Sequence, residues 1–436
     1  MTDTSPQIAS AALEPATFDW NAPATRRRFA ARHRADRRLQ IYGLSAIALA
    51  VLLIAVLIGS LVSTGYQSFV QTHVSFEVYA DPTKVDATDP AAGNFRLMVR
   101  ESFAAQFPEV SNPRDRRALY DIMTADAPYV VRDLVVDDPS LVGRRFQVTM
   151  PVSDAFDQLQ KGVTPRDVPE TQRKVSDKQM AWFDALAARG QISVPFNDEL
   201  FLAADSRFPE LAGLAGAIVG SFYALLVCFL ISFPVGIAAA VYLEEFARKG
   251  RWSDILEVNI NNLAAVPSVV FGLLGLAVFL GVFGLPRSTP LVGGMVLALM
   301  TLPTIIIATR AALKGVPPSI REAALGVGAS KHQVILHHVV PLAMPGILTG
   351  TIIGMAQALG ETAPLLLIGM NAFITSPPGG ILEPATALPT QIFIWADSPE
   401  RGFVARTSAA ILVLIGFLII MNLIAVVLRK RFERRW

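Results

Sequence analysis

Apolar and polar residues are segregated along this chain into long blocks. Stretches without any Asp, Glu, Lys or Arg cover residues 39–76, 211–243, 258–286, 288–309, 332–360, 362–382 and 407–428. A helix needs about 20 apolar residues to cross a bilayer, and these stretches are of that order or longer. The pattern therefore predicts an all-α polytopic membrane protein with six transmembrane helices: Leu44–Val62, Leu211–Tyr242, Leu263–Phe283, Leu291–Ala312, Gly346–Met370 and Ser408–Leu428. We expect Ala358–Thr362, with Gly360 and Glu361, to interrupt the fifth helix.

Residues 65–210, between the first two predicted spans, have the mixed pattern of a folded domain. Asn112 followed by Pro113 is a typical helix start, and Glu170–Arg189 repeats apolar residues at helical spacing before Gly190. Three runs rich in β-branched and aromatic residues favour strands: Val74–Tyr79, Tyr129–Val136 and Phe146–Met150. We therefore predict an α+β domain inserted into the helical protein.

Lys and Arg residues predict the orientation, because short cytoplasmic loops near spans carry an excess of them. With a cytoplasmic N-terminus, the inner segments hold 19 of these residues and the two short outer loops hold only Arg287, Arg401 and Arg406. We therefore expect both termini to be cytoplasmic, in a bacterial inner membrane. The predicted parts are a basic cytoplasmic tail (1–40), a first transmembrane helix (41–64), a periplasmic domain (65–210) and a five-helix core (211–436).

The composition excludes several classes of protein. Only 17% of the residues are charged, against about a quarter in soluble proteins, and the charges avoid whole blocks, which excludes a soluble enzyme, a nucleic-acid-binding protein and a disordered chain. The seven arginines between Arg26 and Arg38 adjoin a span, so we interpret them as a topology anchor that contacts anionic lipid.

Metal and nucleotide sites are not predicted. The single cysteine, Cys228, lies in an apolar block, which leaves no disulfide or cysteine cluster. His332, His337 and His338 have no carboxylate or Cys in ligand register. The phosphate-binding sequence G-x-x-x-x-G-K-[ST] does not occur, so we expect no ATPase activity in this chain.

The most informative segment is residues 314–345, on the predicted cytoplasmic side. Pro317 and the proline after it prevent a helix from continuing, and Ser319 with Glu322 three residues later has the pattern of a capping box. Gly326 and Gly328 are expected to end that helix after about two turns.

A second short helix is predicted to follow. Ser330 and Gln333 form another capping-box pattern, and Pro341 is expected to stop the helix. The turn between the two helices is made of small residues, which would let another protein approach the backbone closely.

This segment resembles the EAA motif in the permeases of binding-protein-dependent ABC importers. In that family the helix pair docks into a groove of the cytoplasmic ATPase, so the resemblance implies ATPase coupling through Glu322, Ala323, Ala324, Gly328 and Pro341. Two positions before the proline depart from the family's usual Ile and Leu, and are His338 and Val340.

Further segments resemble the PstA family of phosphate permease subunits: Pro234–Phe246, Asn259–Ser268, Thr301–Thr304 and Gly360–Leu366. The resemblance extends from Leu211 to the C-terminus. It implies a type I ABC importer core, a second homologous permease subunit, a periplasmic phosphate-binding protein, phosphate as the substrate, and an ATPase dimer that binds ATP and Mg²⁺. It implies no cofactor in this chain.

Glu361 is the only acidic residue in the apolar part of the last five spans, and an ionisable group at that depth marks a pathway or a buried pair. Since like charges repel, we expect its carboxylate to hold a cation or to accept a proton from phosphate. Arg310, at the inner end of the fourth span, is the predicted partner or phosphate contact, because guanidinium binds phosphate oxygens bidentately. Neutral hydrogen bonds are expected from Thr362, Ser268, Asn259, Asn261 and Asn262.

Gln357 departs from the family, in which an Arg often stands four residues before this Glu. The amide keeps hydrogen-bond donors but no charge, which shifts the anion contact to Arg310 or to the partner subunit. A structural helix–helix hydrogen bond for Glu361, and a simple topology anchor for Arg310, remain alternative interpretations.

Three other functions stay open at this point. The chain has the features of an importer for another solute, such as sulfate or molybdate. A membrane sensor would account for the large outer domain. A secondary transporter needs no ATPase and leaves the EAA motif unexplained.

Overall fold

The computed structural model describes residues 23–86, 89–248 and 250–432. It contains two compact units, one ending at Ser60 and the other beginning at Leu61. The described part of the first unit lies within helix α1 (Pro23–Gly65), which contains the predicted span Leu44–Val62. Residues 1–22 of the predicted basic tail, with Lys249, Arg434 and Arg435, lie outside the described residues.

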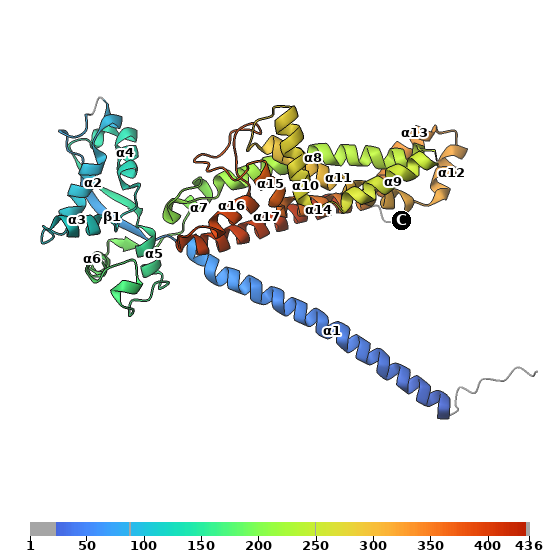
Figure 1. The fold of residues 1–436 in the computed structure, drawn as a ribbon, viewed down its shortest axis with the longest axis horizontal. Coiled ribbons are helices and arrows are strands. Elements are labelled where there is room, and N and C mark those ends of the chain that lie inside the picture. The colour runs from blue at the N-terminus through green and yellow to red at the C-terminus, as the bar shows by residue number, and fades with distance from the viewer. Residues whose placement is uncertain (1–22, 87–88, 249, 433–436) are drawn as a thin grey trace, which may run out of the picture. The chain divides into compact units, whose positions relative to one another are not determined.

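The inserted domain (residues 65–210) is built on a three-stranded antiparallel sheet with the order β2-β1-β3. β1 (His73–Tyr79) pairs along its length with β2 (Arg145–Pro151), and these strands contain two of the three predicted ones. β3 (Ile192–Ser193) pairs only with the first two residues of β1. The helices that accompany the sheet (Figure 1) are α2 (Phe95–Ala104), α3 (Pro113–Tyr120), α4 (Ala127–Asp137), α5 (Asp154–Gln160) and α6 (Asp177–Ala188). The short helix α7 (Glu199–Leu202) packs instead against the start of the helical core, where Leu200 is buried. Short 3-10 turns are η1 (Tyr66–Phe69), η2 (Pro90–Ala92), η3 (Pro139–Leu141), η4 (Glu170–Gln172) and η5 (Pro209–Leu211).

One face of the sheet covers a hydrophobic core that belongs to this domain. Val74, Phe76 and Val78 are fully buried, whereas the alternate residues of β1 are partly or fully exposed, as the two-residue period of a strand requires. The ring of Phe103 in α2 packs edge-on against Phe76, with centroids 5.0 Å apart, and Phe183 of α6 joins the same core. The domain therefore has the predicted α+β character.

The strand predicted at Tyr129–Val136 is wrong, because these residues lie in α4. Ala127, Val131 and Val135 recur every four residues and are the buried ones, which is the period of a helix. Pro128 also suits a helix start. Burial at helical spacing therefore outweighed the β-branched composition, whose preference for strands depends strongly on context.

Two helix starts in this domain follow their caps. α3 begins as predicted after Asn112, whose side chain accepts a hydrogen bond from the backbone of the second helical residue. α6 begins at Asp177 rather than at Glu170, because Ser176 and Gln179 form a capping box.

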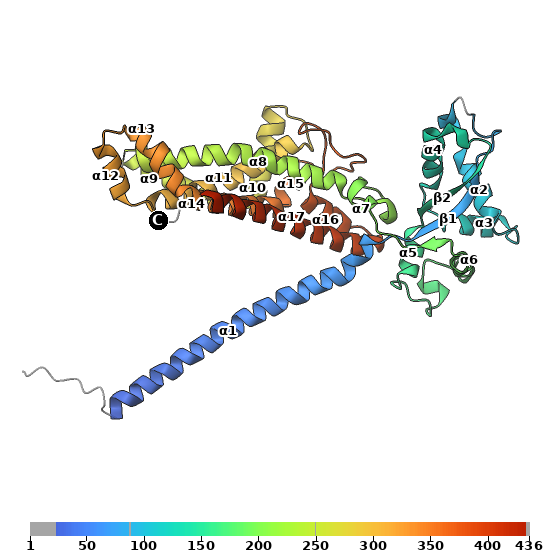
Figure 2. The same ribbon diagram turned by 180° about the vertical axis from the view of Figure 1, so that it is seen from behind.

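The rest of the chain forms the helical core. Its elements are α8 (Ala215–Val241), η6 (Tyr242–Phe246), α9 (Arg251–Ala264), α10 (Ser268–Leu274), η7 (Gly275–Val282), α11 (Pro290–Lys314), α12 (Pro318–Gly326), α13 (Lys331–Val334), η8 (Ile335–Val339), α14 (Val340–Gly360), α15 (Ala363–Leu367), α16 (Leu388–Ala396) and α17 (Gly402–Phe432). Here η6, η7 and η8 are π-helical turns. Helices α8, α11, α14 and α17 lie side by side (Figure 1 and Figure 2).

The described helices largely agree with the predicted spans. Five are long and apolar enough to cross a membrane: Arg26–Phe69, Ala215–Phe246, Pro290–Lys314, Lys331–Gly360 and Gly402–Arg431. A sixth is counted if the pair Arg251–Ala264 and Ser268–Val282, bent by 103°, is one span. The predicted third span, Leu263–Phe283, therefore crosses a sharp bend, because Pro267 separates α9 from α10.

Small residues bring α11 and α14 together in antiparallel fashion. A Cβ added to Gly346 would lie 2.7 Å from the Cβ of Ala312, and one added to Gly350 would overlap the Cβ of Ala308. Such contacts let two helix backbones approach closely inside a membrane. They also fix which residues of α11 and α14 lie at the same level.

Candidate functional site

The first short helix of the EAA loop (residues 314–345) is α12, which starts two residues earlier than predicted. Pro317 occupies the capping position, so Ser319 already lies in the first turn and makes no cap. The predicted capping box of Ser319 with Glu322 is therefore wrong. A proline at the first helical position has a suitable φ and lacks the N–H that a cap would satisfy. The end of α12 is as predicted, and Gly328 beyond it has a φ of 88°, which favours glycine.

The second helix of the EAA loop continues further than predicted. Ser330 and Gln333 form the expected capping box. Pro341 does not stop the helix: α13 runs through the π-helical turn η8 into α14. A π turn shifts the hydrogen-bond register by one residue, and Pro341, which has no N–H to donate, lies two residues after the last residue of this turn. The wide turn therefore accommodates the proline.

The motif residues of α12 point in different directions. Glu322, Ala323 and Gly328 are exposed, and Val327 adds apolar surface with 85% of its area exposed. Ala324 is buried within its own chain, so its small side chain serves internal packing. The exposed residues form a small-residue surface with an apolar neighbour, which suits docking of another protein.

Arg310 lies in an ion-pair cluster at the same end of the helical core. Its Nε donates to Glu244 Oε2 at 3.3 Å and its Nη2 donates to Glu257 Oε2 at 2.9 Å. Lys314 Nζ lies 3.7 Å from the same Glu244 oxygen. The Arg310 side chain is only 14% exposed. Two carboxylates therefore occupy the guanidinium that was predicted to contact Glu361 or phosphate.

Arg310 and Glu361 lie far apart. Because α11 and α14 are antiparallel, Gly346 lies level with Ala312, and Leu365 meets Gly293 near the other end of α11. In that register, Glu361 lies level with the first half of α11, whereas Arg310 lies near the end of α11. At a rise of 1.5 Å per residue, the two levels are about 20 Å apart along the helix axis. The predicted Arg310–Glu361 pair is therefore wrong for this structure. The fifth span, predicted to extend to Met370, ends at Gly360.

Glu361 lies at a break between two helices, as predicted. α14 ends at Gly360, and Thr362 immediately precedes the short helix α15. Glu361 is half-buried, and no described residue forms an ion pair with its carboxylate. α10 packs on α15, since a Cβ added to Gly272 would lie 2.7 Å from Pro364 Cα.

The structure groups some predicted pathway residues and separates others. Ser268 lies one helical turn before the α10–α15 contact, and Thr362 lies two residues before it, so both are near Glu361. Gln357 is exposed one turn earlier in α14, whereas Asn262 is exposed on α9, beyond the 103° bend. The candidate pathway group is therefore Glu361, Thr362, Ser268 and Gln357.

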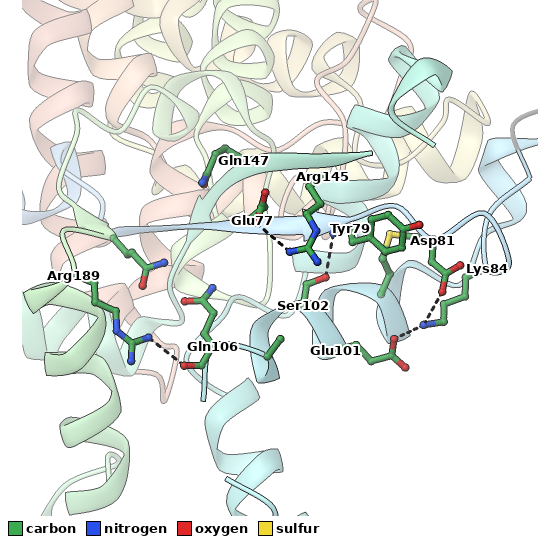
Figure 3. A pocket seen from close by; sticks show the side chains of 13 residues that line it. Glu77, Tyr79, Asp81, Lys84, Glu101, Ser102, Gln106, Arg145, Gln147 and Arg189 are labelled. Atoms are coloured by element: carbon green, nitrogen blue, oxygen red, sulfur yellow. Dashed lines mark hydrogen bonds and ion pairs between the residues drawn. The ribbon is translucent and has the colours of Figure 1, made fainter. Parts of the chain in front are cut away.

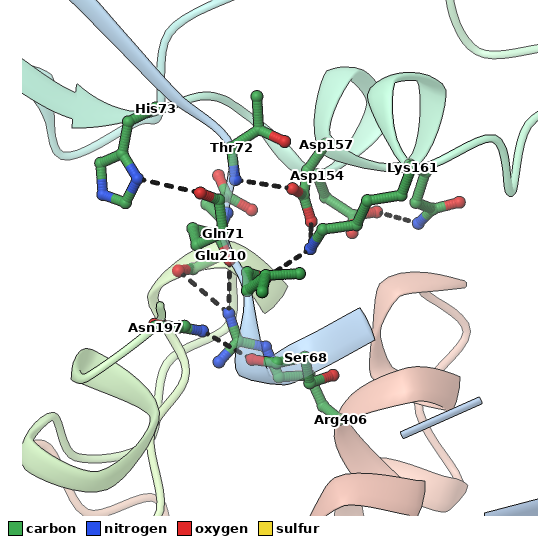
Figure 4. A network of polar contacts seen from close by, with 12 residues as sticks. Ser68, Gln71, Thr72, His73, Asp154, Asp157, Lys161, Asn197, Glu210 and Arg406 are labelled. Carbon is green, nitrogen blue, oxygen red and sulfur yellow. Dashed lines mark hydrogen bonds and ion pairs between the residues drawn. The ribbon is translucent and has the colours of Figure 1, made fainter. Parts of the chain in front are cut away.

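A buried polar network joins the inserted domain to α17 (Figure 4). Arg406, only 4% exposed, donates to the backbone oxygens of Ala212 at 2.7 Å and Glu210 at 3.2 Å, and to Gln71 Oε1 at 3.1 Å. Nearby, Lys161 Nζ lies 2.5 Å from Asp157 Oδ2. The sequence placed Arg406 in an outer loop and did not predict its burial. The sequence feature that indicates burial is its position directly before the apolar stretch 407–428.

Burial changes the acidity of the groups in this network that lie outside the helical spans. It raises the pKa of the Glu210 carboxyl to about 7. Burial also raises the pKa of Asp154 and lowers the pKa of the Lys161 ammonium. In each case loss of water disfavours the charged form.

The inserted domain has a cavity of about 600 Å³ beside β1, β2 and α2 (Figure 3). Its lining carries both signs of charge. Lys84 contacts Asp81 and Glu101, and Arg145 lies 3.5 Å from Glu77. Most of the positive charge in this cavity is therefore already neutralised by carboxylates.

Comparison with known proteins assigns the chain to a class. Residues 232–436 match the family described as the binding-protein-dependent transport system inner membrane component. Residues 26–170 match a domain of unknown function, DUF3333. The first match covers most of the helical core and defines an inner-membrane permease component of a transport system.

Individual relatives narrow the family. The phosphate transport system permease protein PstA of Haemophilus influenzae is 32% identical, over 52% of this chain and 78% of the relative. PstA 2 of Mycobacterium bovis is 34% identical, over 51% and 74%. The probable ABC transporter permease YqgI of Bacillus subtilis is 29% identical, over 46% and 73%. This chain belongs to the PstA-type family of ABC transporter permeases.

Two solved structures that match part of the chain are given for comparison. The inward-facing MetNI methionine ABC transporter matches with a TM-score of 0.39 and 18% identity, over 51% of this chain and 95% of that one. A bacterial ABC transporter that imports alginate matches with a TM-score of 0.38 and 20% identity, over 50% and 80%.

Proposed function

We propose that this chain is the permease subunit of an ATP-driven importer of inorganic phosphate, and that it lines part of the translocation pathway and docks the ATPase. The observation that carries the proposal is the exposed EAA surface of α12, in a core that is 32% and 34% identical to two phosphate permeases. The ATPase groove would receive Glu322, Ala323 and Gly328.

In this proposal both termini are cytoplasmic and the inserted domain is periplasmic. The Lys/Arg excess supports this orientation. The contacts at the two ends of α17 agree with it: Arg429 Nη1 lies 3.4 Å from Thr349 Oγ1, near the EAA end of α14, whereas Arg406 joins the inserted domain. One end of α17 therefore contacts α14 near the EAA loop, and the other end contacts the inserted domain.

The complex requires partners. A second homologous permease would complete the pathway, and an ATPase dimer would hold ATP and Mg²⁺. A periplasmic binding protein would deliver phosphate. Closure of the ATPase dimer would move α12 and so alternate the access of the pathway between the two sides.

Glu361, Thr362 and Ser268 are the proposed pathway residues of this chain, with Gln357 one turn away. The carboxyl of Glu361 would accept a proton from phosphate or bind a cation of the partner subunit. Arg310 holds α11 to Glu244 and Glu257 in this structure, so we assign it to that contact rather than to phosphate.

The assembled complex provides the test. The chain, co-expressed with the ATPase, the second permease and the binding protein, should yield a complex whose ATP hydrolysis rises when phosphate-loaded binding protein is added. Gly328→Leu should abolish ATPase binding, since a leucine at a φ of 88° is strained and its side chain would obstruct the docking surface. Membrane insertion should be unchanged. Stimulation by sulfate or molybdate, with phosphate inert, would contradict the substrate assignment and favour the importer of another oxyanion.

A further inference from the structure

The π-helical turn at the end of α8 contacts both short helices of the EAA loop. Glu245 in this turn (η6) lies 2.7 Å from Arg321 of α12. The ring of Phe246, the next residue, contacts His332 of α13 in a tilted arrangement with centroids 5.0 Å apart, and the Lys331 ammonium lies 5.1 Å from the Phe246 ring centroid. A π turn adds a residue to the helix and often marks a functional position.

Arg321 joins three elements at once. Its Nη2 donates to Glu245 Oε1 at 2.7 Å and to the carbonyl of Leu313 at 2.9 Å. Its Nη1 donates to the carbonyl of Val316 at 2.7 Å. Leu313 is in the last turn of α11, whose final carbonyls lack helical partners. Arg321 therefore caps α11, pairs with the end of α8, and belongs to α12.

The location of this contact makes it stronger than an ordinary surface pair. The Arg321 and Glu245 side chains are only 24% and 10% exposed, and a partly buried charged hydrogen bond is less screened by water and salt. Arg321 also directly precedes Glu322, which is exposed on the docking surface. One residue thus points into the helical core and its neighbour points towards the proposed ATPase.

We infer that Arg321 is a positioning residue that transmits the movement of the coupling helix α12 to α8 and α11. The inference rests on the proposed function. When the ATPase moves α12, the Arg321 contacts carry that displacement to two spans of the pathway. Besides these polar contacts, α12 is joined to α11 by the turn Gly315–Pro317 and by apolar packing, in which Ala324 lies in the same cluster as Leu313 of α11. Loss of the directional Arg321 contacts would therefore weaken the transmission of movement to the spans while α12 stays attached.

Reconstituted complexes separate this role from docking. Arg321→Gln should leave ATPase co-purification and ATP hydrolysis near wild type, while phosphate transported per ATP falls by about fivefold or more, the lower end of typical coupling energies. Glu245→Gln should reduce the ratio less, because Arg321 keeps its two carbonyl contacts. Arg321→Lys should be intermediate, since an ammonium cannot span all three acceptors. Lys314→Gln is the matched control: it removes a 57% exposed cation at the same end of the core, whose ion pair is with Glu244 of η6 rather than with a residue of α12.

The ratio of phosphate transported to ATP hydrolysed distinguishes a positioning role from a purely structural one. Loss of a purely structural residue would lower assembly and uptake together and leave this ratio unchanged. Three results would overturn the inference: an unchanged transport-to-hydrolysis ratio in Arg321→Gln, a ratio equally reduced in Lys314→Gln, or loss of ATPase binding in both Arg321→Gln and Glu245→Gln. Failure of the wild-type complex to transport phosphate would instead contradict the proposed function.

Discussion

At the scale of single residues, burial sets the protonation of Glu210. Its carboxyl has a pKa of about 7 in the folded protein, against 4.5 for an exposed glutamate, so the folded protein binds more protons between these values. The free energy of unfolding should therefore fall as the pH rises from about 4.5 to about 7, by up to about 3 kcal/mol. Below pH 4.5 the carboxyl is neutral in both states and adds no pH dependence.

Glu210→Gln should flatten this dependence, because an amide does not ionise. The measurement is thermal unfolding of the full-length protein in detergent or nanodiscs between pH 4.5 and 8. Glu109 is an exposed acid of the same domain, and Glu109→Gln should keep the wild-type slope. A wild-type slope in Glu210→Gln would show that another group titrates.

Glu361 should matter for transport and not for assembly. Glu361→Gln removes the ionisable carboxyl at the α14–α15 break, and phosphate uptake should fall by about tenfold or more, as expected for loss of one strong hydrogen bond in the rate-determining step. The ATPase should still co-purify, since Glu361 lies about 20 Å along the helices from the Arg310 end. Asp397 is an exposed acid in the loop between α16 and α17, and the Asp397→Asn variant should transport phosphate normally. Wild-type uptake by Glu361→Gln would remove this residue from the pathway.

The sequence located the charged residues of the site but could not pair them. Arg310 was assigned to Glu361 because each stood out against an apolar background. The structure pairs Arg310 with Glu244 and Glu257. These pairs result from the topology, because the ends of α8 and α11 and the helix α9 meet at one end of the core. Pairing only those charged residues that the predicted topology places on the same side of the membrane would have identified Glu244 and Glu257. The contacts of Arg406 could not be predicted in this way, because they depend on how the inserted domain packs.

At the scale of elements, the α11–α14 interface predicts a sensitive position. Gly350→Ala should destabilise the protein by about 1–3 kcal/mol, because the new Cβ overlaps that of Ala308 and overpacked cores cost about this much. Ala308→Gly should restore stability in the double variant. Gly416 in α17 has open space around it, so Gly416→Ala should be neutral or slightly stabilising. Thermal unfolding of the three variants decides: equal stability of Gly350→Ala and Gly416→Ala would refute the packing argument.

Element boundaries followed caps and burial more than composition. Ser330 and Gln333 identified the start of α13 correctly, because that capping box is purely local. Pro341 was misjudged because a π turn, which no local pattern signals, lets the helix continue. The residues of α4 were misassigned because their composition favours a strand while their buried positions recur every four residues.

At the scale of the whole molecule, the inserted domain should be dispensable for transport. It has its own hydrophobic core. Ser75 N donates to Gln191 O at 2.8 Å, so the two ends of the segment between these residues lie side by side and a short linker can join them. Replacing residues 76–190 with a short glycine linker should retain phosphate uptake. A membrane sensor would lose its function in this deletion, so complete loss of activity, with normal insertion and ATPase binding, would favour that alternative.

The most direct test of the central claim is uptake of labelled phosphate by proteoliposomes that hold the full complex, with ATP inside and the phosphate-binding protein outside. Import should require ATP, the binding protein and an intact EAA surface, and unlabelled phosphate should compete where sulfate does not. Import of phosphate without ATP hydrolysis, or ATP-driven import of a different solute with phosphate excluded, would contradict the account.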